Sequence, residues 1–201
     1  MILKHCTSFL LFCFVLSACS RTTQNMIEST KISNDAERTL TNDSLPFPQS
    51  WLGYWEGDLE IFKENKVVQT IPMALELMEI DTSENFTWAI IYGEDKEAGR
   101  RPYEMEVVDA EKGYFLVDEK NTIKLESYLF QNKLLCWYEV MGNQILSIQE
   151  KHGDEMTFEI IFGSTEPVSI TGNQTFEGED IPEVKTFPIG GYQRAVLRKR
   201  S

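Results

Sequence analysis

The chain has 201 residues, of which 42% are hydrophobic and 11% aromatic, so it is long enough for one folded domain with its own core. Its formal net charge of −13 repels phosphate backbones, and we therefore expect no nucleic-acid partner.

Residues 1–18 have the pattern of a signal peptide. Lys4 supplies a short positive region, and residues 9–16 form an apolar stretch too short to span a bilayer as a stable helix. Residues 16–19, with the sequence LSAC, resemble the lipobox of bacterial lipoprotein precursors. This resemblance implies cleavage before Cys19 and lipidation of the Cys19 thiol. An ordinary secretory signal or an uncleaved anchor is the alternative.

Lipidation would give the chain a membrane partner through the lipid on Cys19 and place it in the cell envelope, because two or three acyl chains anchor a protein stably. Ser20 stands where an aspartate would be the usual signal for retention in the inner membrane. The outer membrane is therefore favoured.

Residues 19–50 are polar, rich in Ser, Thr and Asn, and contain few aromatic residues. Such a composition buries too little apolar surface to fold alone. We expect a flexible lipidated tether that ends where the folded domain, residues 51–201, begins.

From Trp51 onward, short runs of β-branched and aromatic residues alternate with polar residues and are separated by turn sequences. The expected strands cover residues 54–62, 67–80, 86–92, 101–109, 114–119, 123–130, 133–141, 144–151, 155–162 and 192–199. Hairpin connections throughout predict an all-β fold, an antiparallel up-and-down barrel of about 8–10 strands. Residues 164–191 lack this pattern and are expected to form a long loop that is functional or wraps the outside.

The first strand opens with Gly53 and Trp55, which together resemble the G-x-W signature of the calycins, the superfamily of lipocalins, fatty-acid-binding proteins and avidins. The resemblance implies a calycin-like (lipocalin-like) barrel in which Trp55 plugs one end and an arginine of the closing strand packs across it. Arg194 is the candidate for this barrel closure, with Arg198 as the alternate. Residues 51–199 also resemble a group of small uncharacterised bacterial secreted proteins. The ten expected strands and the Pro-rich segment before the last one depart from the lipocalin pattern.

A barrel of this size can enclose one small ligand. The candidate ligand-binding residues are Trp88, Tyr92, Arg101, Tyr103 and Trp137. Aromatic walls with one inward cation would suit a small amphipathic molecule that carries a carboxylate. Plain core packing is the alternative for each aromatic residue, and Arg101 decides between the two, because an inward arginine needs an anion.

The mature chain would contain one histidine, His152, and, besides the lipidated Cys19, one cysteine, Cys136, so an internal disulfide is excluded. We find no nucleophile motif, and we expect no enzyme, no metal site and no cofactor. The leading hypothesis is an envelope lipoprotein whose barrel binds a small apolar or amphipathic molecule. The alternative is a structural or protein-interaction lipoprotein with a filled barrel and no ligand.

Overall fold

The computed structural model describes residues 46–200. The predicted signal peptide, the lipidation site at Cys19 and most of the predicted tether lie outside these residues. Within residues 46–200, no helix is long and apolar enough to cross a membrane.

The described chain begins with a short 3-10 helix, η3 (Gln49–Trp51), and continues entirely in strands and turns. The strands are β1 (Gly53–Lys63), β2 (Lys66–Leu77), β3 (Phe86–Tyr92), β4 (Arg100–Asp109), β5 (Tyr114–Asp118), β6 (Lys124–Phe130), β7 (Lys133–Val140), β8 (Asn143–His152), β9 (Glu155–Ser164), β10 (Ser169–Thr171), β11 (Gln174–Phe176), β12 (Glu179–Ile181), β13 (Val184–Thr186) and β14 (Gly191–Lys199).

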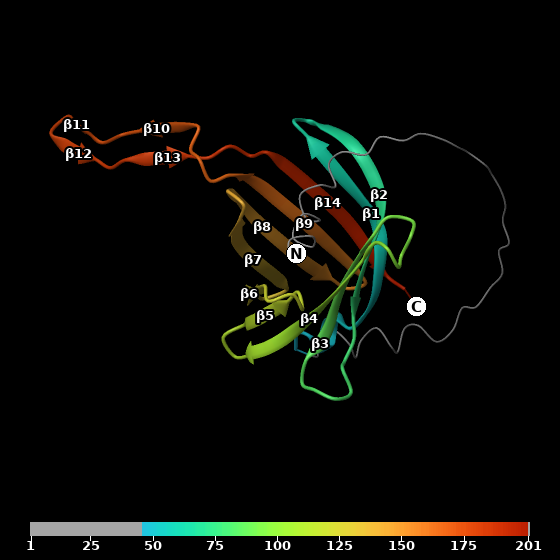
Figure 1. Cartoon of the computed structure of the whole chain (residues 1–201). Helices are drawn as coiled ribbons and strands as arrows, with labels where there is room; N and C mark the ends of the chain where they lie inside the picture. Colours follow the sequence, from blue (N-terminus) through green and yellow to red (C-terminus); the bar gives the residue numbers. More distant parts are fainter. Residues whose placement is uncertain (1–45, 201) are drawn as a thin grey trace, which may run out of the picture. The chain divides into compact units, whose positions relative to one another are not determined.

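Ten of these strands form one closed antiparallel barrel in the order β1-β14-β9-β8-β7-β6-β5-β4-β3-β2 (Figure 1). The all-β barrel and its hairpin connections confirm the fold class predicted from the sequence. Closure comes from β1 and β14, which pair from Trp55↔Lys199 to Phe62↔Tyr192. Gly57 fits this closure, because a Cβ atom there would meet the carbonyl oxygen of Val196 at 2.2 Å.

The prediction that residues 164–191 form a long loop without strands is wrong. We call residues 165–190 the arm. They contain four short strands that form two ribbons, β10 with β13 and β11 with β12. Every residue of these four strands is exposed, so the arm continues the β9–β14 pair instead of wrapping the barrel (Figure 1). Turn residues such as Gly172 and Gly178 dominate its sequence and obscure the strands between them.

The core lies inside the barrel and is densest at the end that carries Trp51 and Lys199, which we call the Trp55 end. Trp55, Leu75, Leu77, Met105, Met156 and Leu197 are fully buried there. We call the opposite end, from which the arm emerges, the arm end.

Phe47 also belongs to the core of the Trp55 end, although the sequence analysis placed it in the tether. Its ring makes T-shaped, edge-to-face contacts with the rings of Trp51 and Phe115, with centroids 4.8 Å apart in each pair. A single aromatic residue between two prolines is too little periodicity to reveal this contact from sequence.

Candidate functional site

Trp55, to which the calycin resemblance assigns the role of barrel plug, lies in the core at the Trp55 end. Its side chain is fully buried, and its indole N–H donates a hydrogen bond of 2.8 Å to the carbonyl oxygen of Trp51. A buried indole needs such a partner, because an unsatisfied donor in the core is costly.

The predicted contact between Trp55 and Arg194 is wrong. The cation over the Trp55 ring is Lys199, whose Nζ lies 5.6 Å from the ring centroid, and Trp55 pairs in register with Lys199. Arg194 pairs with Glu60 further along β14 and lies 3.8 Å from Glu159.

The alternate partner, Arg198, is also excluded by the direction of its side chain. Successive side chains of a strand point to opposite faces. Ala195, Leu197 and Lys199 therefore face inward, whereas Arg194 and Arg198 face outward with Val196. Arg198 ends 3.6 Å from Glu155, with its side chain 79% exposed.

Four of the predicted ligand-binding residues do face the interior, on two neighbouring strands. On β3, Trp88 pairs with Tyr103 of β4, and Ile90 pairs with Arg101 of β4. Tyr92 of β3 pairs with Met73 of β2. Trp88 is buried within the packed core, whereas Tyr92 is half-buried against its arm end. Only Tyr92, Arg101 and Tyr103 therefore remain as candidates for contact with a ligand.

Trp137 does not join them, and its assignment to the interior is wrong. Its side chain is 72% exposed, because Leu134 and Cys136 of β7 are the buried positions and Trp137 has the opposite parity. Both faces of this strand carry aromatic side chains, so the alternation in the sequence could not decide which face lies inside.

Two interior residues were missed, Tyr138 and Glu119. Tyr138 shares the inward parity of Leu134 and Cys136 on β7, and Glu119 follows β5 with the parity of Phe115 and Val117. Parity with Phe115 and Val117 was the signal that could have found Glu119, whereas no alternation in the sequence distinguished Tyr138 from Trp137.

The electrostatics place these groups together. Burial raises the pKa of Tyr92, with the neighbouring Tyr103 adding to the effect and Arg101 opposing it. Burial, aided by the Glu119 carboxylate, likewise raises the pKa of Tyr103 to about 12. We call Tyr92, Arg101, Tyr103, Glu119 and Tyr138 the polar wall.

Burial also raises the pKa of Tyr138, and the nearby Cys136 and Glu119 raise it further. The pKa of Glu119 itself is raised by burial, although the side-chain amide of Asn121 donates to this carboxylate at 3.2 Å and opposes the shift. The tyrosine hydroxyls of the polar wall are therefore neutral at physiological pH and can act as hydrogen-bond donors.

Arg101 is the charged group of this wall, and in the described part of the chain it forms no ion pair. Its guanidinium donates only to the carbonyl oxygens of Arg100, at 3.2 Å, and Ala98, at 3.4 Å. Neighbouring Arg100 has the opposite parity and forms an ion pair with Glu76 instead.

Apolar side chains line the interior on β1, β2 and β9. Ile61 of β1, Ile71 of β2 and Ile160 of β9 pack against the core while remaining partly exposed. We call these three residues the apolar wall. The arm end of the interior thus offers a polar wall and an apolar wall.

Comparison of the chain with protein-family models, with curated proteins and with solved structures finds no match. The closed ten-stranded antiparallel barrel agrees with the calycin resemblance at the level of architecture. Function must therefore be argued from the side chains themselves.

A cavity of about 300 Å³ lies outside the barrel, on the outer face of β1, β2 and β3. Tyr54, Glu56 and Lys96 line one side of it, and neither Trp88 nor Tyr92 does. Lys96 already occupies this side, because its Nζ lies 3.1 Å from the Tyr54 hydroxyl and 3.9 Å from Glu56.

Proposed function

We propose that the arm end of the barrel interior binds a small amphipathic molecule with an anionic head group. The observation that carries the proposal is Arg101, a guanidinium on an inward-facing position that has no carboxylate partner among residues 46–200. A charge that is partly withdrawn from water and left unpaired destabilises a fold. An anionic ligand would supply the missing partner through charge-assisted hydrogen bonds.

The neighbouring tyrosines fit the same head group. The hydroxyls of Tyr92 and Tyr103 keep their protons, because burial raises the pKa of both groups. A neutral phenol can donate a hydrogen bond to a carboxylate, whereas a phenolate would repel it. The apolar wall would then take the hydrocarbon part of the ligand, because burying each methylene contributes about 0.8 kcal/mol.

Titration with dodecanoate by isothermal calorimetry tests this proposal, with dodecyltrimethylammonium as a ligand of the same length and opposite charge. We expect dodecanoate to bind the full chain and the cation to bind far more weakly. Arg101→Gln should weaken dodecanoate binding about tenfold or more, the scale of one charge-assisted hydrogen bond.

Arg198→Gln is the matched control, because Arg198 is an exposed arginine of the outer face, and it should leave the affinity unchanged. Equal binding of both surfactants, or equal affinities of the Arg101 variant and the unmodified chain, would refute an anion site at Arg101.

We also propose that the protein acts at the cell envelope, anchored through lipid on Cys19. The support is the sequence of residues 1–19 alone. Expression of the chain in a Gram-negative host with radiolabelled palmitate tests it. Incorporation that is lost in Cys19→Ser supports the anchor, whereas an unlabelled chain in the soluble fraction contradicts it.

A second candidate function is an interaction protein with a filled barrel, and the dense packing of the Trp55 end favours it. Leu75, Met105 and Met156 are fully buried and leave no room for a ligand at that end. Native mass spectrometry of the full chain purified from its host separates the two functions. A co-purifying small molecule favours the ligand carrier, and a bare chain that also fails to bind dodecanoate favours the filled barrel.

A further inference from the structure

Apolar side chains form two continuous rows on the outside of the barrel. Along the first row the pairing partners are Trp137, Leu146, Ile161, Tyr192 and Phe62, from β7 through β8, β9 and β14 to β1. Along the second row they are Tyr114, Tyr128, Leu135 and Ile148, from β5 through β6 and β7 to β8. We call these nine residues, with Phe130 and Met141, the outer apolar face.

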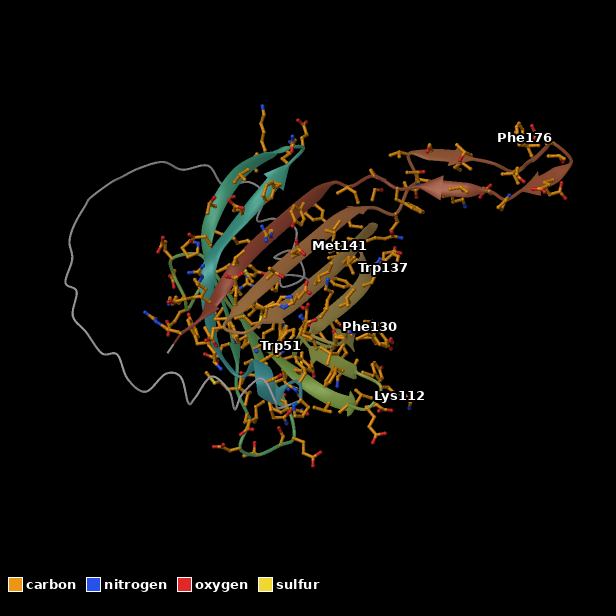
Figure 2. The ribbon with its side chains drawn as sticks, turned by 180° about the vertical axis from the view of Figure 1, so that it is seen from behind. Trp51, Lys112, Phe130, Trp137, Met141 and Phe176 are labelled. Atoms are coloured by element: carbon orange, nitrogen blue, oxygen red, sulfur yellow. The ribbon has the colours of Figure 1, made fainter. Side chains whose placement is uncertain are left out.

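These positions are on the outer side of each strand, where solvent is expected. Trp137 is 72% exposed, Met141 70% and Phe130 65%, and Figure 2 shows all three on the same side of the barrel. Scattered exposed apolar residues are normal, but a contiguous set rimmed by polar residues marks an interaction surface.

We propose that the outer apolar face is the contact surface of a symmetric homodimer, with a second copy of this chain packed on it sheet against sheet. A two-fold axis that lies in the interface and crosses β7 at right angles level with Cys136 would pack Trp137 on Leu135 of the other copy, and so the first row of each copy on the second row of the other. Self-packing of one patch on itself is the usual geometry of a two-fold dimer.

The charges on this face permit a second copy even though the whole chain carries −13. The outward charged residues of β6, β7 and β8 are two lysines and three glutamates, a net charge of 2 − 3 = −1. They are Lys124, Lys133, Glu126, Glu139 and Glu150. These three central strands therefore carry almost no net charge that would repel a second copy.

The same charges are arranged for self-complementarity. Lys133 begins β7 on one side of Trp137, and Glu139 lies near the end of β7 on the other side. Glu139 forms no ion pair with any described residue, whereas Lys133 lies 3.1 Å from Glu150. A two-fold axis level with Cys136, midway between positions 133 and 139, would bring Lys133 of each copy to Glu139 of the other and so fix the register of the dimer.

The size of the face is also sufficient. Five of its seven strands at about 4.8 Å and eight residues at about 3.4 Å give a footprint of roughly 650 Å². Two copies would then bury roughly 1,300 Å², the lower end of specific protein–protein interfaces. An interface of this size favours a dimer that exchanges with monomer at micromolar concentration.

Sedimentation velocity of the full chain, over about 1 to 200 µM, tests the proposal through mass action. We expect the unmodified chain to pass from monomer to dimer with a dissociation constant of roughly 1–50 µM. Trp137→Glu should remain monomeric over the whole range, because it buries a charge at the centre of the interface.

Phe176→Glu is the matched control, because Phe176 of the arm is a similarly exposed aromatic residue, 61% exposed, that lies outside the outer apolar face (Figure 2). It should dimerise like the unmodified chain. The charge-swapped variants Lys133→Glu and Glu139→Lys should each weaken the dimer, and the double variant should restore it.

An unmodified chain that stays monomeric at the highest concentration would overturn the proposal, as would a dimer that Trp137→Glu leaves intact. Dimerisation that Phe176→Glu abolishes would place the interface on the arm and equally reject the outer apolar face. Sedimentation of the protein with and without dodecanoate keeps this result separate from ligand binding.

Discussion

The two ends of the barrel interior differ in the kind of side chain that each encloses. The Trp55 end holds large apolar side chains at full burial, closed by an indole whose N–H is satisfied. The arm end holds an arginine, a glutamate and three tyrosines against isoleucines that remain partly exposed. Under the proposed function, one barrel separates stability from recognition, because packing at one end leaves the other end free to keep groups that do not stabilise the fold.

The largest expected effect comes from Trp55→Ala, which removes the plug of the Trp55 end. Loss of a fully buried indole and of its hydrogen bond should lower the free energy of unfolding by about 3–5 kcal/mol. Urea denaturation followed by circular dichroism measures the change. Trp137→Ala in dilute monomer is the control and should change stability by less than about 0.5 kcal/mol; equal losses would erase the distinction between core and outer face.

A smaller effect should appear at the arm end in alkaline solution. Because the pKa of Tyr103 is raised to about 12 in the folded chain and is ordinary in the unfolded chain, the unfolded state loses its proton first as pH rises. The stability held below pH 10 should fall by up to about 1.4 kcal/mol per pH unit for this group, until the folded group also titrates near pH 12.

Denaturation at a series of pH values from about 9 to 11 checks this expectation, with Tyr103→Phe for comparison. The variant should lose part of the pH dependence, and an identical slope in both proteins would contradict the burial of this hydroxyl.

Lys199→Met should have a modest effect at the Trp55 end, because a cation over an indole contributes about 0.5–2 kcal/mol. The fluorescence of Trp55 should shift with the loss of stability. Arg194→Met removes the cation that the sequence had favoured and should leave this fluorescence unchanged. The reverse result would restore the contact between Arg194 and Trp55.

The smallest effect is expected from removing the arm. Gly190 donates to the carbonyl oxygen of Phe162 at 2.8 Å, so β9 and β14 are already adjacent where the arm begins. Replacing residues 165–189 with a two-residue Asn-Gly turn should change the free energy of unfolding by less than about 0.5 kcal/mol. A loss above about 2 kcal/mol in thermal or urea unfolding would show that the arm contributes to the barrel core.

Much of the barrel could be predicted from sequence because its strands alternate cleanly. Residues 155–162 place Met156 and Phe158 on one face, and the structure buries both. Turn residues such as Gly142 and Asn143 marked the hairpins, although the turn itself, with positive φ angles, lies one residue earlier at Met141 and Gly142.

The candidate site was predicted only in part, because it depends on parity and on contacts between distant strands. Tyr92, Arg101 and Tyr103 came from strands with one apolar face. Trp137 and Tyr138 are adjacent aromatic residues on β7, so only the register with β8 reveals which of them faces inward. For the same reason, a shift of one position along β14 separates Arg198, the alternate to the predicted Arg194, from the observed Lys199.

The way the arm is attached has a consequence for how this protein can diversify. The arm is attached at Ser164 and Gly190, which adjoin the neighbouring strands β9 and β14. A peptide inserted in its place therefore needs only two ends that lie as close together as these two residues. Evolution could lengthen, shorten or exchange such an appendage without disturbing a single ladder of the barrel. For the experimenter, the same point is a ready place to graft an epitope or a fluorescent label.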